Sequence, residues 1–97
     1  MHYAVMSGSV EQRLRAEAEH CYQWSNGPGA EYAVHTHPYR KILYVDQGSI
    51  TFEPAGKPAI VMGPGDRLEL PAGTPHGAVV GAEGVTCWEG QAKEQKL

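Results

Sequence analysis

The sequence predicts an all-β fold with one short N-terminal helix. Twelve glycines and seven prolines interrupt the 97 residues at short intervals, so the pieces between them are too brief for a bundle of helices. Residues 49–53 and 67–70 alternate apolar and polar side chains, as strands with one buried face do. Hydrophobic residues make up 41% of the chain and charged residues 20%, a balance typical of a folded globular protein.

The helix is expected at residues 10–19, which read VEQRLRAEAE. Ser9 stands where an N-cap residue is expected, and Gln12 completes a capping-box pattern three residues later. We therefore expect a short helix that begins after Ser9 and lies on the outside of the strands.

The strands follow in the remainder of the chain. Residues 42–45, ILYV, are apolar at every position, so we expect both faces of this strand to be covered. Contact with a second copy of the chain would cover Ile42 and Tyr44, and we therefore expect a homodimer. The expected strands are residues 21–24, 31–37, 41–47, 49–53, 59–62, 67–71, 76–80 and 85–89.

A chain of this length buries enough surface for one core, so we expect a single domain over residues 1–97. Its core is expected at about residues 20–90, after an N-terminal segment, 1–19, that carries the helix. The polar tail, residues 91–97, is expected to be frayed.

Charge and hydropathy exclude several classes of partner. The net charge is −3 and the basic residues are scattered, which argues against binding to nucleic acid or to an anionic membrane. No apolar run has the length of a signal sequence or a membrane span, so we expect a cytoplasmic protein with a small-molecule ligand. Cys21 and Cys87 lack the spacing of a zinc or redox motif and are expected to stay reduced.

Two histidines, His35 and His37, stand one residue apart in the expected strand 31–37. Alternate residues of a strand point to one face, which places their Cα atoms about 6.6 Å apart with both rings able to turn toward one ion. With five histidines in the chain, one such pair can arise by chance. The surrounding residues therefore decide its meaning. His2 and His20 lie outside this region and are expected to be solvated.

Glycines and a third histidine frame the pair in two motifs. The first motif consists of Gly29, His35, His37 and Gly48, and the second, within GDRLELPAGTPH, consists of Gly65, Pro71, Gly73 and His76. In these motifs the sequence resembles the cupin superfamily, over about residues 20–90. The resemblance implies a cupin-type jelly-roll β-barrel. Asp66, after the glycine of the second motif, is expected to cap backbone N–H groups of a turn.

In cupins the three motif histidines and a glutamate hold a divalent metal ion, so the resemblance implies His35, His37 and His76 as metal ligands. This sequence departs from the motifs at two positions, because Lys41 replaces the glutamate and Val80 replaces a closing asparagine. Three imidazoles suit zinc, iron, manganese, nickel or copper, and the sequence does not choose among these metals.

Lys41 raises an electrostatic question. An ammonium about 5 Å from a divalent ion is repelled by on the order of 6 kcal/mol at an effective dielectric constant of about 20. The site is then empty, the lysine is neutral, its stem carries the charge out to water, or a bound anion lies between the two cations. Lys41 and Tyr39 are the candidate catalytic residues, with Tyr39 in the loop after His37 as a hydrogen-bond partner.

The resemblance implies a metal-dependent enzyme that acts on a small, anionic metabolite. Dioxygenase-, isomerase- and decarboxylase-type reactions all occur in the superfamily, with the ion as a Lewis acid or as the binding site for oxygen and substrate. Two alternatives stay open. The chain is a non-catalytic module that binds or senses a small ligand, or it is an orphan barrel with an empty site, since fold alone does not decide function.

Overall fold

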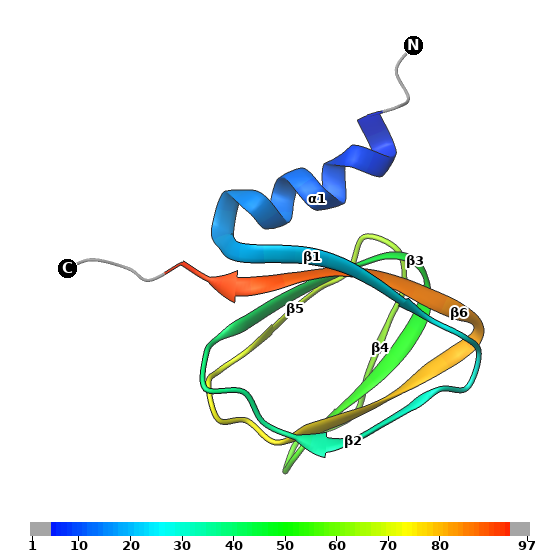
Figure 1. The fold of residues 1–97 in the computed structure, drawn as a ribbon. Helices are drawn as coiled ribbons and strands as arrows, with labels where there is room; N and C mark the ends of the chain where they lie inside the picture. The colour runs from blue at the N-terminus through cyan, green and yellow to red at the C-terminus, as the bar shows by residue number, and fades with distance from the viewer. Residues whose placement is uncertain (1–4, 94–97) are drawn as a thin grey trace.

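A computed structural model describes residues 5–93, which form one helix followed by six strands (Figure 1). The elements are α1 (Val5–Glu17), β1 (Ala18–Asn26), β2 (Glu31–His35), β3 (Lys41–Pro54), β4 (Ile60–Met62), β5 (Arg67–Leu70) and β6 (His76–Ala92). The predicted all-β class with one short helix is confirmed. No helix in this part of the chain is long and apolar enough to cross a membrane.

Two long strands, β3 and β6, form the centre of the sheet. They pair antiparallel from Lys41 opposite Gln91 to Pro54 opposite His76. Strands β1 and β2 pair with successive parts of β6, and β4 and β5 pair with successive parts of β3. The curvature of the two long strands rolls this sheet around an interior, with β2 on the far side from α1 (Figure 1).

Each long strand continues through a position where the sequence predicts a turn. Gly48 lies inside β3 at a bulge, with φ of 78°, and an added Cβ would stand 2.0 Å from the carbonyl oxygen of Gly84 in β6. Glycine has no Cβ, so both the left-handed backbone and this close approach are possible there. The expected strands 41–47 and 49–53 are therefore one strand, as are 76–80 and 85–89.

The helix begins before the predicted start and ends earlier. Ser9 lies inside α1, so the prediction that it is the N-cap is wrong. At the other end, Ala18 pairs with Ala92 of β6 and begins β1 instead of continuing the helix. Glu17, the last helical residue, accepts two hydrogen bonds from Arg67, at 2.8 and 3.0 Å, and a third from Tyr44. Contacts with distant strands, rather than local helix propensity, set this boundary.

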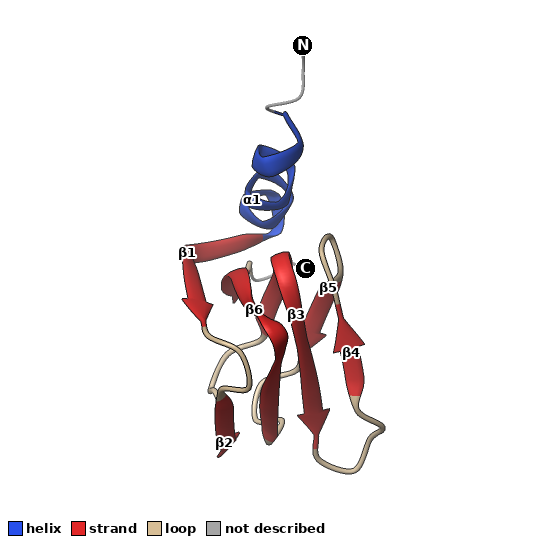
Figure 2. Ribbon diagram, turned by 90° about the vertical axis from the view of Figure 1, so that its right-hand side faces the viewer, coloured by secondary structure: helices blue, strands red, loops and turns tan. Residues whose placement is uncertain are grey.

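Side chains of β3 alternate between two hydrophobic clusters. Leu43 and Val45 point into the interior of the rolled sheet, whereas Ile42 and Tyr44 point outward and are buried against Leu14 of α1. The helix lies outside the sheet against β1, β3 and β6 (Figures 1 and 2). The expectation that both faces of this strand are covered is confirmed. Because α1 provides the cover, the original reason for a homodimer is lost, and dimerisation stays a prediction.

The structure also places the two cysteines and the beginning of the C-terminal tail. Cys87 is buried in the inner cluster and Cys21 packs against the outer one, so the sheet separates the two free thiols. Gln91 and Ala92 belong to β6, and the prediction of a frayed tail is wrong for them. His2 and residues 94–97 lie outside the described residues.

Candidate metal centre

The histidines of the two motifs meet at one end of the sheet. His35 ends β2 and His76 begins β6, where the two residues are direct cross-strand partners. His37 lies just beyond β2, in a loop that the Gly73 N–H anchors by donating to its carbonyl oxygen at 2.8 Å. The sequence placed His37 in the same strand as His35, which is wrong, yet one ring nitrogen from each of the three residues lies within 4.8 Å of the others.

Backbone carbonyls orient two of these rings. Nδ1 of His35 lies 2.7 Å from the carbonyl oxygen of Ala33, and Nδ1 of His76 lies 2.9 Å from that of Thr74. A carbonyl oxygen only accepts hydrogen bonds, so each Nδ1 carries the proton in the neutral ring. The lone pair is then on Nε2, which is the tautomer that a metal ion requires when Nε2 is the ligand atom.

His37 is oriented by a side chain instead. The hydroxyl of Tyr39 lies 3.3 Å from Nδ1 of His37, and the two rings are also in contact. The Nε2 atoms of His37 and His76 are both buried and have no hydrogen-bond partner among the described residues. A buried polar atom without a partner is costly. A metal ion coordinated by these nitrogens would satisfy them, so the residues present fit such an ion.

The electrostatic surroundings favour neutral imidazoles. Burial lowers the pKa of His37, and the nearby ammonium of Lys41 lowers it further. Burial also lowers the pKa of His76, with Lys41 acting in the same direction and the hydrogen bond to Thr74 opposing it. Metal binding needs the unprotonated ring, so both shifts extend the pH range over which the cluster can bind an ion.

Lys41 points into the interior and forms an ion pair that the sequence reasoning missed. It is only 7% exposed, and its Nζ lies 3.1 Å from Oε1 of Glu89, which is also buried. None of the four outcomes considered from the sequence includes an internal counter-ion. The lysine is not turned out to water, so that outcome is wrong.

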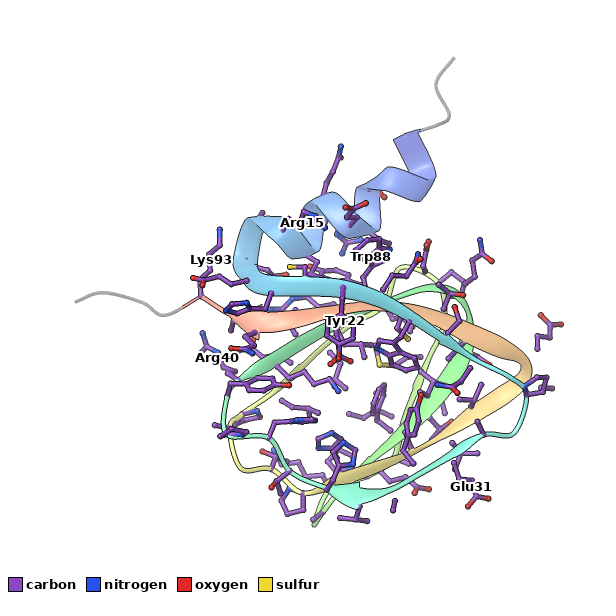
Figure 3. All side chains as sticks on the ribbon, viewed as in Figure 1. Arg15, Tyr22, Glu31, Arg40, Trp88 and Lys93 are labelled. Atoms are coloured by element: carbon purple, nitrogen blue, oxygen red, sulfur yellow. The ribbon has the colours of Figure 1, made fainter. Side chains whose placement is uncertain are left out.

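Glu89 is itself held by two side chains of β1. The hydroxyl of Tyr22 donates to Oε2 at 2.7 Å, and the indole Nε1–H of Trp24 donates to Oε1 at 2.8 Å. Burial and then the bond to Glu89 raise the pKa of Tyr22, so the phenol stays protonated. Figure 3 shows Tyr22 pointing from β1 into the interior of the rolled sheet. The sequence held one signal for this role. Glu89 stands two residues after Cys87, so both side chains point to the same face of a strand that is otherwise largely apolar.

One cavity of about 300 Å³ joins the histidines to this ion pair. Its walls combine polar groups with aromatic and aliphatic ones. His35 is exposed and Tyr22 is 52% exposed, so the cavity is open to solvent beside them. It is lined by Tyr22, Trp24, Asn26, Tyr32, His35, His37, Lys41, Phe52, His76, Ala78 and Glu89.

Asp66 and His20, which were considered from the sequence, lie outside the cavity. Asp66 accepts a hydrogen bond from the N–H of Gly63 at 2.8 Å, which confirms its predicted structural role in a turn. His20 is exposed in β1 and does not join the histidine cluster. Its backbone has φ of 56°, in the left-handed region, within the irregularity between Glu19 and Tyr22.

A family model described as "Cupin domain" matches residues 23–88. The chain belongs to the cupin family. The match begins in β1 and ends in β6, so it includes all three clustered histidines and Lys41. The rolled antiparallel sheet is thus the jelly roll that the motifs predicted. No curated protein matches this cupin.

Solved structures also resemble it. DMSP lyase DddQ from Ruegeria pomeroyi DSS-3 is 25% identical, with a TM-score of 0.71, over 79% of this chain and 39% of the lyase. KdgF from Halomonas sp. is 26% identical, with a TM-score of 0.64, over 76% of this chain and 69% of that protein. A cupin-like protein from Thermotoga maritima msb8 is 30% identical, with a TM-score of 0.66, over 73% and 55%. This cupin spans about two fifths of the lyase.

Proposed function

We propose that this cupin is a metal-dependent enzyme that acts on a small, anionic metabolite, with His35, His37 and His76 as the ligands of one divalent transition metal ion. The observation that carries the proposal is the pair of buried, unpartnered Nε2 atoms of His37 and His76. The carbonyl contacts at Nδ1 of His35 and His76 support it, because they leave the lone pairs on Nε2. Zinc, iron, manganese and nickel all fit these ligands.

The charges around the cavity support an anionic substrate. Three neutral imidazoles do not reduce the charge of a divalent ion, and the ion pair of Lys41 with Glu89 adds no net charge. The cavity would therefore be net positive with the metal bound. When bound, such an ion acts as a Lewis acid that polarises an oxygen atom of the substrate.

The residues around the metal centre have separate roles in this proposal. Lys41 lines the cavity and offers N–H groups to a substrate, whereas the hydroxyl of Tyr22 is used to hold Glu89. Tyr39 bonds to His37 and positions that ring, so we assign it an orienting role and not a chemical one. Among dioxygenase-, isomerase- and decarboxylase-type reactions, the 25% identity to a lyase supports a bond cleavage that consumes no oxygen.

Metal analysis tests the first part of the proposal. Protein purified without a histidine tag is expected to bind about one zinc ion per chain after loading and desalting. His37→Ala and His76→Ala are expected to lose it. The matched control is His20→Asn, which removes an imidazole outside the cluster and keeps a residue that tolerates the left-handed backbone. Unchanged zinc content in His37→Ala would show that the ligand assignment is wrong.

A substrate screen tests the second part. Metal-loaded protein is mixed with small carboxylic acids, and products are followed by NMR with parallel measurement of oxygen uptake. Turnover without oxygen uptake is the expected result, and oxygen consumption would favour a dioxygenase instead. Binding without turnover would favour the ligand-binding module, and failure to bind any metal would favour the orphan barrel.

A further inference from the structure

The ammonium of Lys41 has unused hydrogen-bonding capacity inside the cavity. A protonated lysine has three N–H donors. Among the residues that the structure describes, Glu89 is the one partner of Lys41 Nζ, at 3.1 Å. The side chain is 8% exposed and lines the cavity, so the remaining donors are left for a ligand or a water molecule inside that cavity. Buried donors of this kind are normally satisfied by some partner.

Glu89 cannot leave its place to serve another group. Each of its oxygens already accepts a hydrogen bond from β1, Oε2 from Tyr22 and Oε1 from Trp24. These bonds hold the carboxylate beside Lys41 whether or not a ligand is present. The ammonium is therefore held in one position by a fixed counter-ion. Binding of a ligand would then not have to order a long, mobile lysine side chain, which lowers its entropic cost.

Lys41 and the histidines lie close enough to share one ligand. Lys41, His37 and His76 all line the same cavity of about 300 Å³. Trp24, Tyr32 and Phe52 also line this cavity. A ligand that extends from the histidines to Lys41 would therefore contact aromatic side chains and the N–H donors of the ammonium.

We propose that Lys41, held by Glu89, is a specificity-determining residue that binds the carboxylate of a small, otherwise apolar acid in this cavity. The proposal rests on the proposed function for the identity of the substrate site, but the carboxylate contact itself depends only on Lys41 and its supports. It explains why a buried lysine occupies a position that faces the histidines. A neutral or aliphatic side chain at position 41 would leave Glu89 as an unpaired buried charge and would attract no anion.

The double variant Lys41→Met/Glu89→Gln is the appropriate test, because it removes both charges and leaves no buried ion unpaired. The glutamine keeps an oxygen that can accept from the Trp24 indole. The probes are butanoate and its uncharged counterpart, butanamide. Binding is followed through the indole N–H resonance of Trp24, which is bonded to Glu89. Trp88 is the internal control, since it lies on the helix side of the sheet near Arg15 (Figure 3).

Zinc-loaded wild type is expected to bind butanoate about tenfold or more tightly than the zinc-loaded double variant, the size typical of hydrogen bonds to a charged group. Butanamide is expected to bind the two proteins equally. Equal affinities for butanoate would overturn the assignment, because they would mean that zinc alone holds the anion. Zinc content, measured on the same samples, separates the two proposals. Loss of zinc from both proteins would overturn the metal site, while a butanoate difference in those samples would still support Lys41.

Discussion

His35 and His76 lie directly opposite one another on β2 and β6, with their ring centroids 4.5 Å apart. The register of two strands thus joins the two motifs, which are far apart in the sequence. Each ring is turned by a hydrogen bond to a backbone carbonyl two residues earlier, so the sheet defines both the position and the tautomer of these two groups. The third histidine, His37, depends on Tyr39 instead.

The ion pair of Lys41 and Glu89 predicts strong coupling between two substitutions. Lys41→Met and Glu89→Gln each leave one buried charge without its partner, and each is expected to lower the free energy of unfolding by about 3–5 kcal/mol. The double variant is expected to lose much less than the sum of the two, because no isolated charge remains. Urea unfolding of the four metal-free proteins measures this cycle. Additive losses would contradict a direct interaction.

The same pair changes what Lys41→Glu is expected to do. From the sequence, this substitution restores the fourth ligand of the cupin motif, tightens metal binding and exceeds the effect of Lys41→Met. In the structure, the new carboxylate would stand beside Glu89, and the repulsion is expected to destabilise the protein. Combining it with Glu89→Gln removes that repulsion. The combined variant is expected to bind zinc more tightly than wild type in calorimetric titrations, and a weaker affinity would argue that position 41 does not face the ion.

Tyr39 is expected to influence metal affinity through His37. Tyr39→Phe removes the hydroxyl at Nδ1 of His37, and loss of such a supporting bond is expected to weaken zinc binding by about tenfold. Tyr32→Phe is the control, because Tyr32 lines the same cavity but bonds to Asn26. Competition with a chromogenic zinc chelator measures both affinities. Similar affinity in Tyr39→Phe and wild type would show that the contact does not orient the ring.

The stability of the metal-free protein is expected to fall as the pH drops below about 6.5. The pKa of His37 and that of His76 lie below the ordinary value of 6.5 in the folded protein, so the unfolded chain takes up these protons first. The stability that depends on these two neutral histidines is therefore fully present above pH 6.5. It is lost as the pH falls from 6.5 toward their pKa values in the folded protein. The lowered pKa of Glu17 acts in the same direction, but only near or below 4.5.

Urea unfolding between about pH 7.5 and 5 isolates the histidine contribution to this effect. A variant that carries both His37→Asn and His76→Gln is expected to show a flatter profile over this range. An unchanged slope in the variant would mean that other groups cause the pH dependence.

Docking of the helix is expected to contribute substantially to stability. Leu14 is fully buried in the outer cluster with Ile42 and Tyr44, and Leu14→Ala is expected to cost about 2–5 kcal/mol. Glu11→Ala is the control on the same helix, since it removes only the surface ion pair with Arg15, worth at most about 1 kcal/mol. Denaturant unfolding gives both values.

Sedimentation of the same samples tests the predicted homodimer. Comparison of wild type with Leu14→Ala shows whether a dimer forms only when the packing of the helix is weakened.

Local patterns in the sequence predicted much of the fold. Alternation at residues 49–53 and 67–70 identified strands correctly, because the direction of a side chain in a strand depends on its parity alone. The same patterns failed at Gly48 and Ser9. A glycine signals a bulge and a turn equally well, and a serine caps a helix only when the preceding residue is not itself helical.

The candidate site was likewise predicted only in part from the sequence. The resemblance to the cupin motifs was sufficient to predict that His35, His37 and His76 lie together, and one ring nitrogen from each lies within 4.8 Å of the others. The resemblance could not reveal Glu89, because the partner of Lys41 depends on how two distant strands are aligned. In the structure, Leu43 of β3 pairs with Glu89 of β6, and Lys41 lies two residues from Leu43 on the same face. That register is a property of the whole sheet, in which every pairing and the inner cluster contribute together, so only the tertiary structure could give the buried lysine its counter-ion.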